Sequence, residues 1–174
     1  MRRISLAFCV LAAACSGGVL DSPTSPMSVS AASSRGKSGV QLPFRGTFTT
    51  ASTGLPAPPV LEFDGTGSGT ATRLGRFTVV VRETVSLITA TSTGTMNFTA
   101  ANGDRLFTTT TGAEDAFVPP NESHTTVIAT IVGGTGRFAS ATGSFTVRRV
   151  GTIDFATATS TEVGSFEGEI GMEE

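Results

Sequence analysis

Residues 75–79 have the sequence Gly-Arg-Phe-Thr-Val, and residues 143–147, which lie 68 positions later, have the sequence Gly-Ser-Phe-Thr-Val. The same offset aligns the run Thr-Ala-Thr-Ser-Thr at 89–93 with an identical run at 157–161. No gap interrupts this alignment as far as Phe98, whose counterpart is again a phenylalanine. The repeat predicts that one strand-turn-strand element is used twice in this chain.

The repeated segment alternates apolar and polar residues with a period of two, which is typical of a strand with one buried face. Phe77, Val79, Val81, Val85 and Leu87 share one parity. The corresponding parity of the second copy holds Phe145, Val147, Ile153 and Phe155. Further strands are predicted at residues 44–50, 60–64, 67–73, 88–99, 105–111, 125–132 and 162–170.

These strands predict an all-β fold, a single closed antiparallel barrel of about eight strands, with a β-sandwich as the alternative. Only 15% of the residues are charged, and Thr, Gly, Ser and Val dominate, which is a composition typical of strands and turns. Closure would pair the last strand, with Phe166 and Ile170, with the first strand, with Phe44 and Phe48. A closed barrel is favoured because closure removes the unpaired strand edges.

Two turns are predicted from glycine-containing segments. Asn102 and Gly103 indicate a type I′ hairpin turn, which needs positive φ at both central positions. Gly133, Gly134 and Gly136 permit positive φ in a second turn, after which Phe138 returns to the core. A phosphate-binding loop would need a helix after these glycines, and the residues that follow lead into a strand instead.

The second of these turns carries a family resemblance. Residues 131–138, Ile-Val-Gly-Gly-Thr-Gly-Arg-Phe, and residues 141–145, Ala-Thr-Gly-Ser-Phe, resemble a segment of the allene oxide cyclase and dirigent superfamily of small β-barrels. A looser likeness in strand spacing runs from Leu42 to Ile170. The resemblance implies a barrel like that of bacterial secreted proteins with similar segments. Plant members isomerise a fatty-acid epoxide or orient phenoxy radicals, but their polar pocket residues have no matching positions here.

The N-terminal residues predict export. Residues 1–14 read as a signal peptide, with Arg2 and Arg3 before an apolar run at 4–14. This run ends at Cys15 in a segment that resembles the bacterial lipoprotein box, so Cys15 is the expected site of lipid attachment. An ordinary signal peptide with an incidental cysteine is the alternative. Residues 15–40 are predicted to be a flexible tether rich in Ser, Gly and Pro, and residues 41–174 the barrel domain.

The expected location is the cell envelope, as an outer-membrane lipoprotein or a periplasmic or secreted protein. The residue after Cys15 is Ser16 rather than the aspartate that retains lipoproteins at the inner membrane, which favours the outer membrane. The chain has 12 basic and 14 acidic residues with no basic cluster, which argues against a nucleic-acid partner. The expected partners are the membrane through Cys15, a small hydrophobic ligand, and further copies of the chain through Thr-rich strand faces.

Few residues indicate chemistry. His124 is the only histidine and both cysteines lie at the N-terminus, so no metal site and no cofactor are expected. His124 itself is expected to be an exposed loop residue. Glu83 and Arg149 fall on the core parity of the two repeat copies. They are weak catalytic candidates that could pair inside the barrel, but a β-bulge near Arg82 or Gly151 that sends both to solvent is favoured.

The sequence therefore predicts an exported, lipid-anchored β-barrel with a binding or structural role, and a non-enzymatic function is favoured. The alternative is a cofactor-free isomerase or cyclase that acts on a small hydrophobic molecule, with Glu83 and Arg149 as its polar pair. The interior of the barrel distinguishes these possibilities. A filled interior favours a structural module, whereas a cavity of roughly 300 Å³ or more with convergent polar groups favours ligand chemistry.

Overall fold

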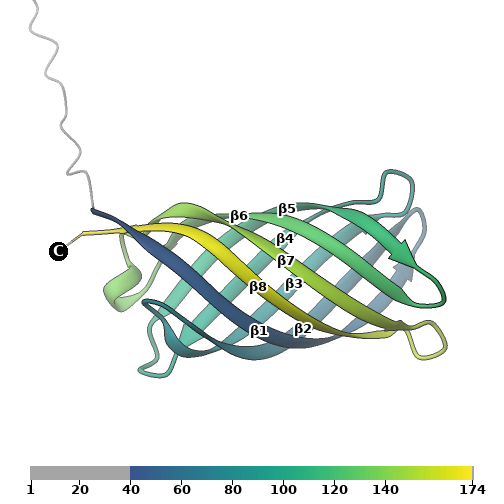
Figure 1. The fold of residues 1–174 in the computed structure, drawn as a ribbon, viewed down its shortest axis with the longest axis horizontal. Coiled ribbons are helices and arrows are strands. Elements are labelled where there is room, and N and C mark those ends of the chain that lie inside the picture. Colours follow the sequence, from purple (N-terminus) through teal and green to yellow (C-terminus); the bar gives the residue numbers. More distant parts are fainter. Residues whose placement is uncertain (1–39, 174) are drawn as a thin grey trace, which may run out of the picture. The chain divides into compact units, whose positions relative to one another are not determined.

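Eight antiparallel strands follow one another around a closed barrel in the computed structural model, which describes residues 40–173 (Figure 1). The first and last strands pair along most of their length, with Leu42 opposite Ile170 and Gly46 opposite Phe166. The predicted closure is confirmed, and a sandwich with free edges is excluded. The strands are β1 (Val40–Ala57), β2 (Val60–Ala71), β3 (Gly75–Ser86), β4 (Thr91–Ala100), β5 (Arg105–Val118), β6 (Glu122–Gly134), β7 (Thr142–Asp154) and β8 (Thr159–Met172).

The sequence repeat corresponds to the β3–β4 and β7–β8 hairpins. Val81 pairs with Met96 in the first hairpin, and Arg149 pairs with Gly164, at the same offset of 68, in the second. Ala90 and Ala158 occupy equivalent positions in the two turns, and both have a φ of 53°, which is rare for a residue with a side chain. The two copies therefore share their register and their turn conformation.

One strand assignment was wrong. The strands predicted separately at 60–64 and 67–73 form the single strand β2. Gly65 and Gly67 lie within this strand where it closely approaches β1. A β-carbon on Gly65 would lie 2.8 Å from Cβ of Ser52, and one on Gly67 would lie 2.6 Å from Cγ2 of Thr50. These glycines leave space for a neighbouring strand and do not mark a turn.

Phenylalanine rings fill the half of the barrel that contains both chain termini of the described region. Phe166 contacts several of the other rings, with centroid separations of 5.0 Å to Phe44 and 5.1 Å to Phe145. Phe98 packs edge-on against Phe77 at 5.2 Å. All of these residues are at least 96% buried. Aromatic pairs at these separations each contribute about 0.5–1.5 kcal/mol beyond the apolar area that they bury.

Glycines on neighbouring strands make room for these rings. Phe48 pairs directly with Gly164, Gly46 with Phe166, and Phe145 with Gly168. A β-carbon on Gly46 would lie 2.5 Å from the tip of the Phe166 ring. Several large rings thus lie opposite glycines, and these glycines leave space for the rings in the narrow interior of an eight-stranded barrel.

The 3-10 helix Gly136–Phe138 lies at the same end of the barrel as the N-terminus of β1 (Figure 1). Phe138 is fully buried, as predicted, and Leu74 from the β2–β3 turn is also buried. Both belong to the same hydrophobic core as the phenylalanine rings. No helix in the described part of the chain is long and apolar enough to cross a membrane.

The two predicted glycine turns differ in detail from expectation. Gly133 and Gly136 have positive φ as predicted, but Gly134 does not. A β-carbon on Gly134 would lie 2.8 Å from Cβ of Phe138, so this glycine is needed for space. The type I′ turn was also wrong: Gly103 has a φ of 90°, whereas Asn102 is not in the positive-φ region.

The observed turn at Gly103 has a three-residue loop. The amide of Gly103 donates to the carbonyl of Ala100 over 2.9 Å, and the amide of Ala100 donates to the carbonyl of Asp104 over 2.8 Å. A loop of this length is commonly a type I turn followed by one residue in the left-handed conformation. Only that residue, here Gly103, needs a positive φ.

Substitution of Gly168 by alanine tests the interlocking of phenylalanine and glycine. The new β-carbon would lie 2.5 Å from Cα of Phe145, which is backbone and cannot move aside without distorting β7. We expect Gly168→Ala to lower the free energy of unfolding by about 1–3 kcal/mol in urea titrations. Gly151→Ala is the matched control on β7, since its nearest neighbour would be 3.3 Å away, and we expect a change within about 0.5 kcal/mol. Equal effects of the two substitutions would contradict the packing described here.

Candidate functional site

The inner face of the barrel changes from aromatic to polar at one level along its length. On β3 the inward residues run from Phe77 through Val79 and Val81 to Glu83, and all four are buried. On β7 the corresponding change comes at Arg149. The phenylalanine-filled half of the barrel therefore ends at a layer of polar side chains, to which β1, β3, β4, β7 and β8 contribute. The members of this polar layer are Thr50, Ser52, Glu83, Ser92, Arg149, Ser160 and Glu162.

Glu83 and Arg149 both face the interior, so the favoured expectation that a bulge sends them to solvent was wrong. Each residue is only 7% exposed. The pairing of β3 with β2 and β4 and of β7 with β6 and β8 continues without interruption past both residues. The register shifts occur in the β5–β6 pair instead.

Arg149 lies between two carboxylates. Its Nη2 donates a hydrogen bond to Oε2 of Glu83 within a buried ion pair. Its Nη1 donates to Oε2 of Glu162 over 3.3 Å. Two hydroxyl groups complete the cluster, because Ser92 Oγ donates to Oε1 of Glu83 over 2.6 Å and Thr50 Oγ1 donates to Oε2 of Glu162 over 3.1 Å.

Glu162 was not among the residues singled out from the sequence, although the repeat holds the signal for it. Glu83 on β3 pairs with Gly94 on β4, and Gly151 on β7 pairs with Glu162 on β8. The offset of 68 relates Glu83 to Gly151 and Gly94 to Glu162. Both hairpins thus contain a glutamate opposite a glycine, but the glutamate lies on the first strand of one hairpin and on the second strand of the other. Each glycine leaves space beside the opposing glutamate.

Burial and charge act in opposite directions on Arg149. Burial alone would lower the pKa of Arg149, but the attraction of Glu162 and Glu83 and their hydrogen bonds outweigh it and raise this pKa. The guanidinium therefore stays charged inside the barrel. Its Nε atom is buried and has no hydrogen-bond partner among the described residues. An incompletely satisfied buried charge costs stability, which makes a purely structural role a poor explanation for the cluster.

A cavity of about 230 Å³ lies on the far side of this cluster from the phenylalanine rings. Its polar groups come from most members of the polar layer and from Glu114, Ser123 and Thr125. Its apolar walls are Leu61, Phe63, Val85, Phe117, Ile153 and Phe155. The volume is below the roughly 300 Å³ of a drug-sized site, but polar groups converge in it. The barrel is therefore filled in one half and hollow in the other.

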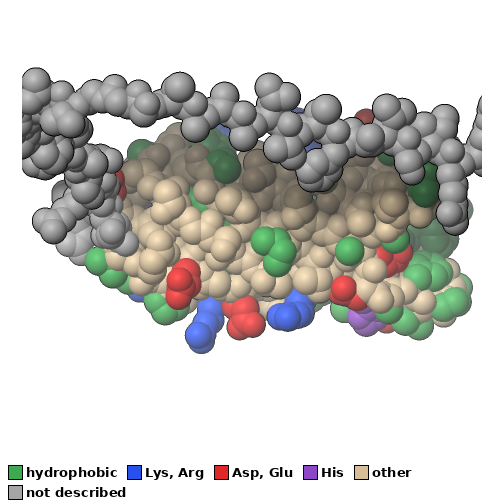
Figure 2. Space-filling view, turned by 90° about the horizontal axis from the view of Figure 1, so that it is seen from above, with side chains coloured by type: hydrophobic (Ala, Val, Ile, Leu, Met, Phe, Trp, Pro, Cys, Tyr) green, Lys and Arg blue, Asp and Glu red, His purple; other side chains and the backbone are tan. Residues whose placement is uncertain are grey.

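The mouth of the cavity is apolar. Leu87, Phe117 and Phe155 line the cavity and are 58%, 43% and 67% exposed. The rings of Phe117 and Phe155 lie edge to face at 6.3 Å. Figure 2 shows hydrophobic side chains gathered at the right-hand end of the barrel, opposite the end where the described chain begins. Exposed apolar side chains around an opening are typical of a ligand entrance.

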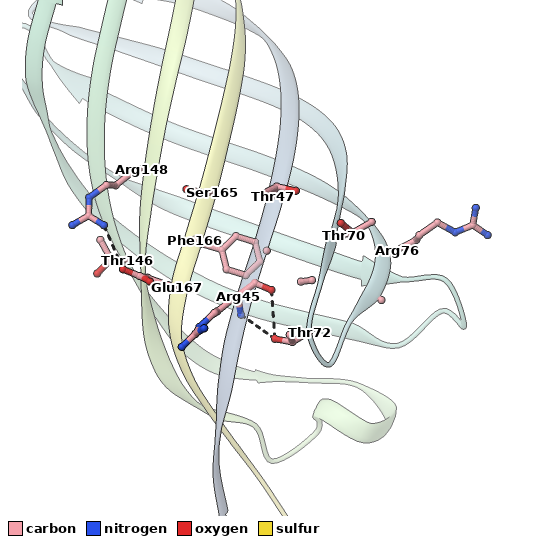
Figure 3. A pocket seen from close by; sticks show the side chains of 13 residues that line it. Arg45, Thr47, Thr70, Thr72, Arg76, Thr146, Arg148, Ser165, Phe166 and Glu167 are labelled. Atoms are coloured by element: carbon pink, nitrogen blue, oxygen red, sulfur yellow. Dashed lines mark hydrogen bonds and ion pairs between the residues drawn. The ribbon is translucent and has the colours of Figure 1, made fainter.

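A larger depression of about 770 Å³ lies on the outer surface, over β1, β2, β3, β7 and β8. Figure 3 shows that the guanidinium groups of Arg45, Arg76 and Arg148 in this depression do not converge on a common point. Arg148 instead pairs with Glu167 at 3.7 Å. Because its polar groups diverge, we assign the candidate site to the smaller interior cavity.

The remaining predicted residues lie apart from this cavity. His124 belongs to β6 rather than to a loop, and its Nε2 lies 2.7 Å from Oε1 of Glu122. It does not line the interior cavity. Cys15, the predicted site of lipid attachment, lies outside the described residues.

No family model, no curated protein and no solved structure matches this chain. The resemblance to the allene oxide cyclase and dirigent superfamily stays a prediction that rests on the residues quoted for it. The conclusions about function below rest on the geometry of the barrel interior.

The ion cluster makes a testable prediction about stability. Arg149→Met leaves two carboxylates in the interior without their cation, and we expect it to lower the free energy of unfolding by about 3–5 kcal/mol in urea titrations. Replacement of the whole cluster, by Arg149→Met together with Glu83→Leu and Glu162→Leu, should restore at least the stability of the unmodified protein. If the triple variant is as unstable as the single variant, the charged cluster itself stabilises the fold. That result would contradict the view that the cluster serves a purpose other than stability.

Proposed function

We propose that this chain is an exported, lipid-anchored β-barrel of the bacterial cell envelope that binds a small, largely apolar ligand in the hollow half of its barrel. The observation that carries the proposal is the cavity of about 230 Å³ between the inward-facing cluster of Glu83, Arg149 and Glu162 and the apolar mouth. Small-molecule sites are commonly apolar concavities with a few polar groups that fix the orientation of the ligand.

The uneven filling of the interior supports binding over a purely structural role. Phenylalanine and aliphatic side chains fill one half of the interior and interlock with glycines on neighbouring strands, so this sequence can pack a barrel interior. In the other half, Gly151 contributes no side chain to a buried inward position. An empty apolar volume next to a costly charged cluster reduces stability on both counts. A ligand that occupies this volume would explain both features.

Export and lipid attachment rest on the N-terminal sequence. The basic residues Arg2 and Arg3, the apolar run at 4–14 and Cys15 support a signal peptide followed by an acylated cysteine. The composition of residues 15–40, rich in Ser, Gly and Pro, supports a tether between the membrane and the barrel. Glu83 and Arg149, the residues predicted to contact a ligand, both lie in the barrel and not in the N-terminal segment.

A cofactor-free isomerase or cyclase is the second candidate, because Glu83 and Arg149 do meet at the cavity. A general base needs a free oxygen within hydrogen-bonding reach of the substrate proton. Both oxygens of Glu83 are engaged, one by Ser92 and one by Arg149. This arrangement supports binding more strongly than proton transfer by Glu83.

Binding in the cavity can be tested with toluene, whose single ring fits a space of this size. We expect toluene to shift the NMR resonances of Phe63, Phe117 and Phe155. Gly151→Leu should abolish these shifts, because its side chain would extend from an inward position into the cavity. Thr70→Leu in the outer depression is the matched control and should leave them unchanged. The proposal fails if toluene does not bind, or if Gly151→Leu binds it as well as the unmodified protein does.

Lipid attachment can be tested by labelling bacteria that produce the full chain with radioactive palmitate. We expect label on the protein, and we expect Cys15→Ser to remove both the label and sedimentation with membranes. Cys9→Ser is the matched control, since Cys9 lies within the predicted signal peptide and should not affect labelling. Label that persists in Cys15→Ser would show that the predicted attachment site is wrong.

A further inference from the structure

One carboxylate beside the cavity has an oxygen that accepts no hydrogen bond from the described residues. Glu162 accepts two hydrogen bonds at Oε2, from Arg149 and Thr50, but Oε1 accepts none from the described residues. Oε1 of Glu162 lies 3.7 Å from the position that a β-carbon on Gly151 would occupy. Because Gly151 lines the cavity, this places an unused carboxylate oxygen beside the cavity.

The hydroxyl donors nearby are already engaged. Ser92 donates to Glu83, and the hydroxyl groups of Ser52 and Ser160 share a hydrogen bond of 2.7 Å. Closer to the mouth, Ser123 donates to Oε1 of Glu114 over 2.8 Å. Oε1 of Glu162 is therefore an acceptor beside the cavity that a ligand with a hydrogen-bond donor would complement.

The charge of the cavity restricts the ligand further. Three carboxylates line it, those of Glu83, Glu114 and Glu162, whereas Arg149 is the one cation among its lining residues. Both terminal nitrogens of the guanidinium already bind carboxylates. The cavity is therefore formally negative, so an anionic ligand would be repelled and a cationic ligand attracted.

The size and walls of the cavity indicate the rest of the ligand. A cavity of about 150 Å³ lined by apolar side chains is known to hold one benzene ring. The volume here, about 230 Å³, suits one ring with a short chain. Phe63, Phe117 and Phe155 offer aromatic faces to such a ring, and aromatic faces also attract cations.

We propose that the cavity binds a small arylalkyl amine, one aromatic ring with a short aminoalkyl chain, in its protonated form, with the ammonium group hydrogen-bonded to Oε1 of Glu162 and the ring among Phe63, Phe117 and Phe155. This inference rests on the proposed function, since it names the class of ligand that the cavity takes. Arg149 acts as a positioning residue, because it holds the other oxygen of Glu162 and so turns Oε1 away from itself.

The test compares three molecules that share a phenylethyl group by calorimetry: 2-phenylethylammonium, 2-phenylethanol and 3-phenylpropanoate. We expect the ammonium to bind at least about tenfold more tightly than the alcohol, since a charged hydrogen bond replaces a neutral one, and the carboxylate to bind most weakly. Raised salt should weaken binding of the ammonium and leave binding of the alcohol unchanged.

Two variants locate the contact. Glu162→Gln should remove the preference for the ammonium over the alcohol while retaining binding of both. Glu167→Gln is the matched control on the same strand, since Glu167 pairs with Arg148 on the outer surface and should leave the preference intact. Urea titrations check that each variant is folded. If Glu162→Gln does not fold, the salt dependence of the unmodified protein decides the question.

The outcomes separate this inference from the proposed function. Binding of the alcohol or the carboxylate as tightly as the ammonium would overturn the inference and leave ligand binding in the cavity intact. Binding of toluene without binding of the ammonium would have the same meaning. If neither toluene nor any of the three probes binds, the proposed function fails together with the inference.

Discussion

The limited width of an eight-stranded barrel is the constraint on which the rest of this structure depends. A large ring fits this narrow interior most readily where it lies opposite a small residue on a neighbouring strand. The pairs of Phe48 with Gly164, Phe166 with Gly46, and Phe145 with Gly168 satisfy this condition in one half of the barrel. In the other half, a glycine lies opposite each of the inward-facing glutamates Glu83 and Glu162, and the interior there holds a cavity instead of a filled core.

The polar cluster arises where the two copies of the internal repeat differ in sequence. Two hairpins with identical register and identical turn conformation would fill the interior in the same way if their sequences were the same. Their inner faces differ where Val81 is replaced by Arg149 and where glutamate and glycine exchange places. These differences bring one cation between two carboxylates, an arrangement that neither hairpin contains alone. The polar cluster therefore depends on closure of the barrel.

The sequence predicted most of the fold, because alternation and the repeat report directly on which face of each strand is buried. The sequence did not predict that 60–64 and 67–73 form one strand. A glycine can mark either a turn or a close approach between two strands, and only the neighbouring strand shows which role Gly65 and Gly67 have. The inward direction of Glu83 and Arg149 followed from parity, yet a bulge was favoured because long strands commonly bulge or reach the barrel rim at such positions, and because charges rarely face a barrel interior alone. Glu162, from a third strand, reduces that cost, and its contact with Arg149 becomes visible only in the folded chain.

The central claim is that Arg149 is held inside the barrel between two carboxylates, and its side-chain Nε–H group reports on this directly. In nitrogen-edited NMR spectra at neutral pH, we expect the Nε–H of Arg149, assigned by its loss in Arg149→Met, to exchange slowly with water, because this atom is buried. Arg148, the next residue towards the N-terminus, faces outward and should exchange rapidly. Exchange at Arg149 as fast as at Arg148 would show that the guanidinium is in solvent and would contradict the buried cluster.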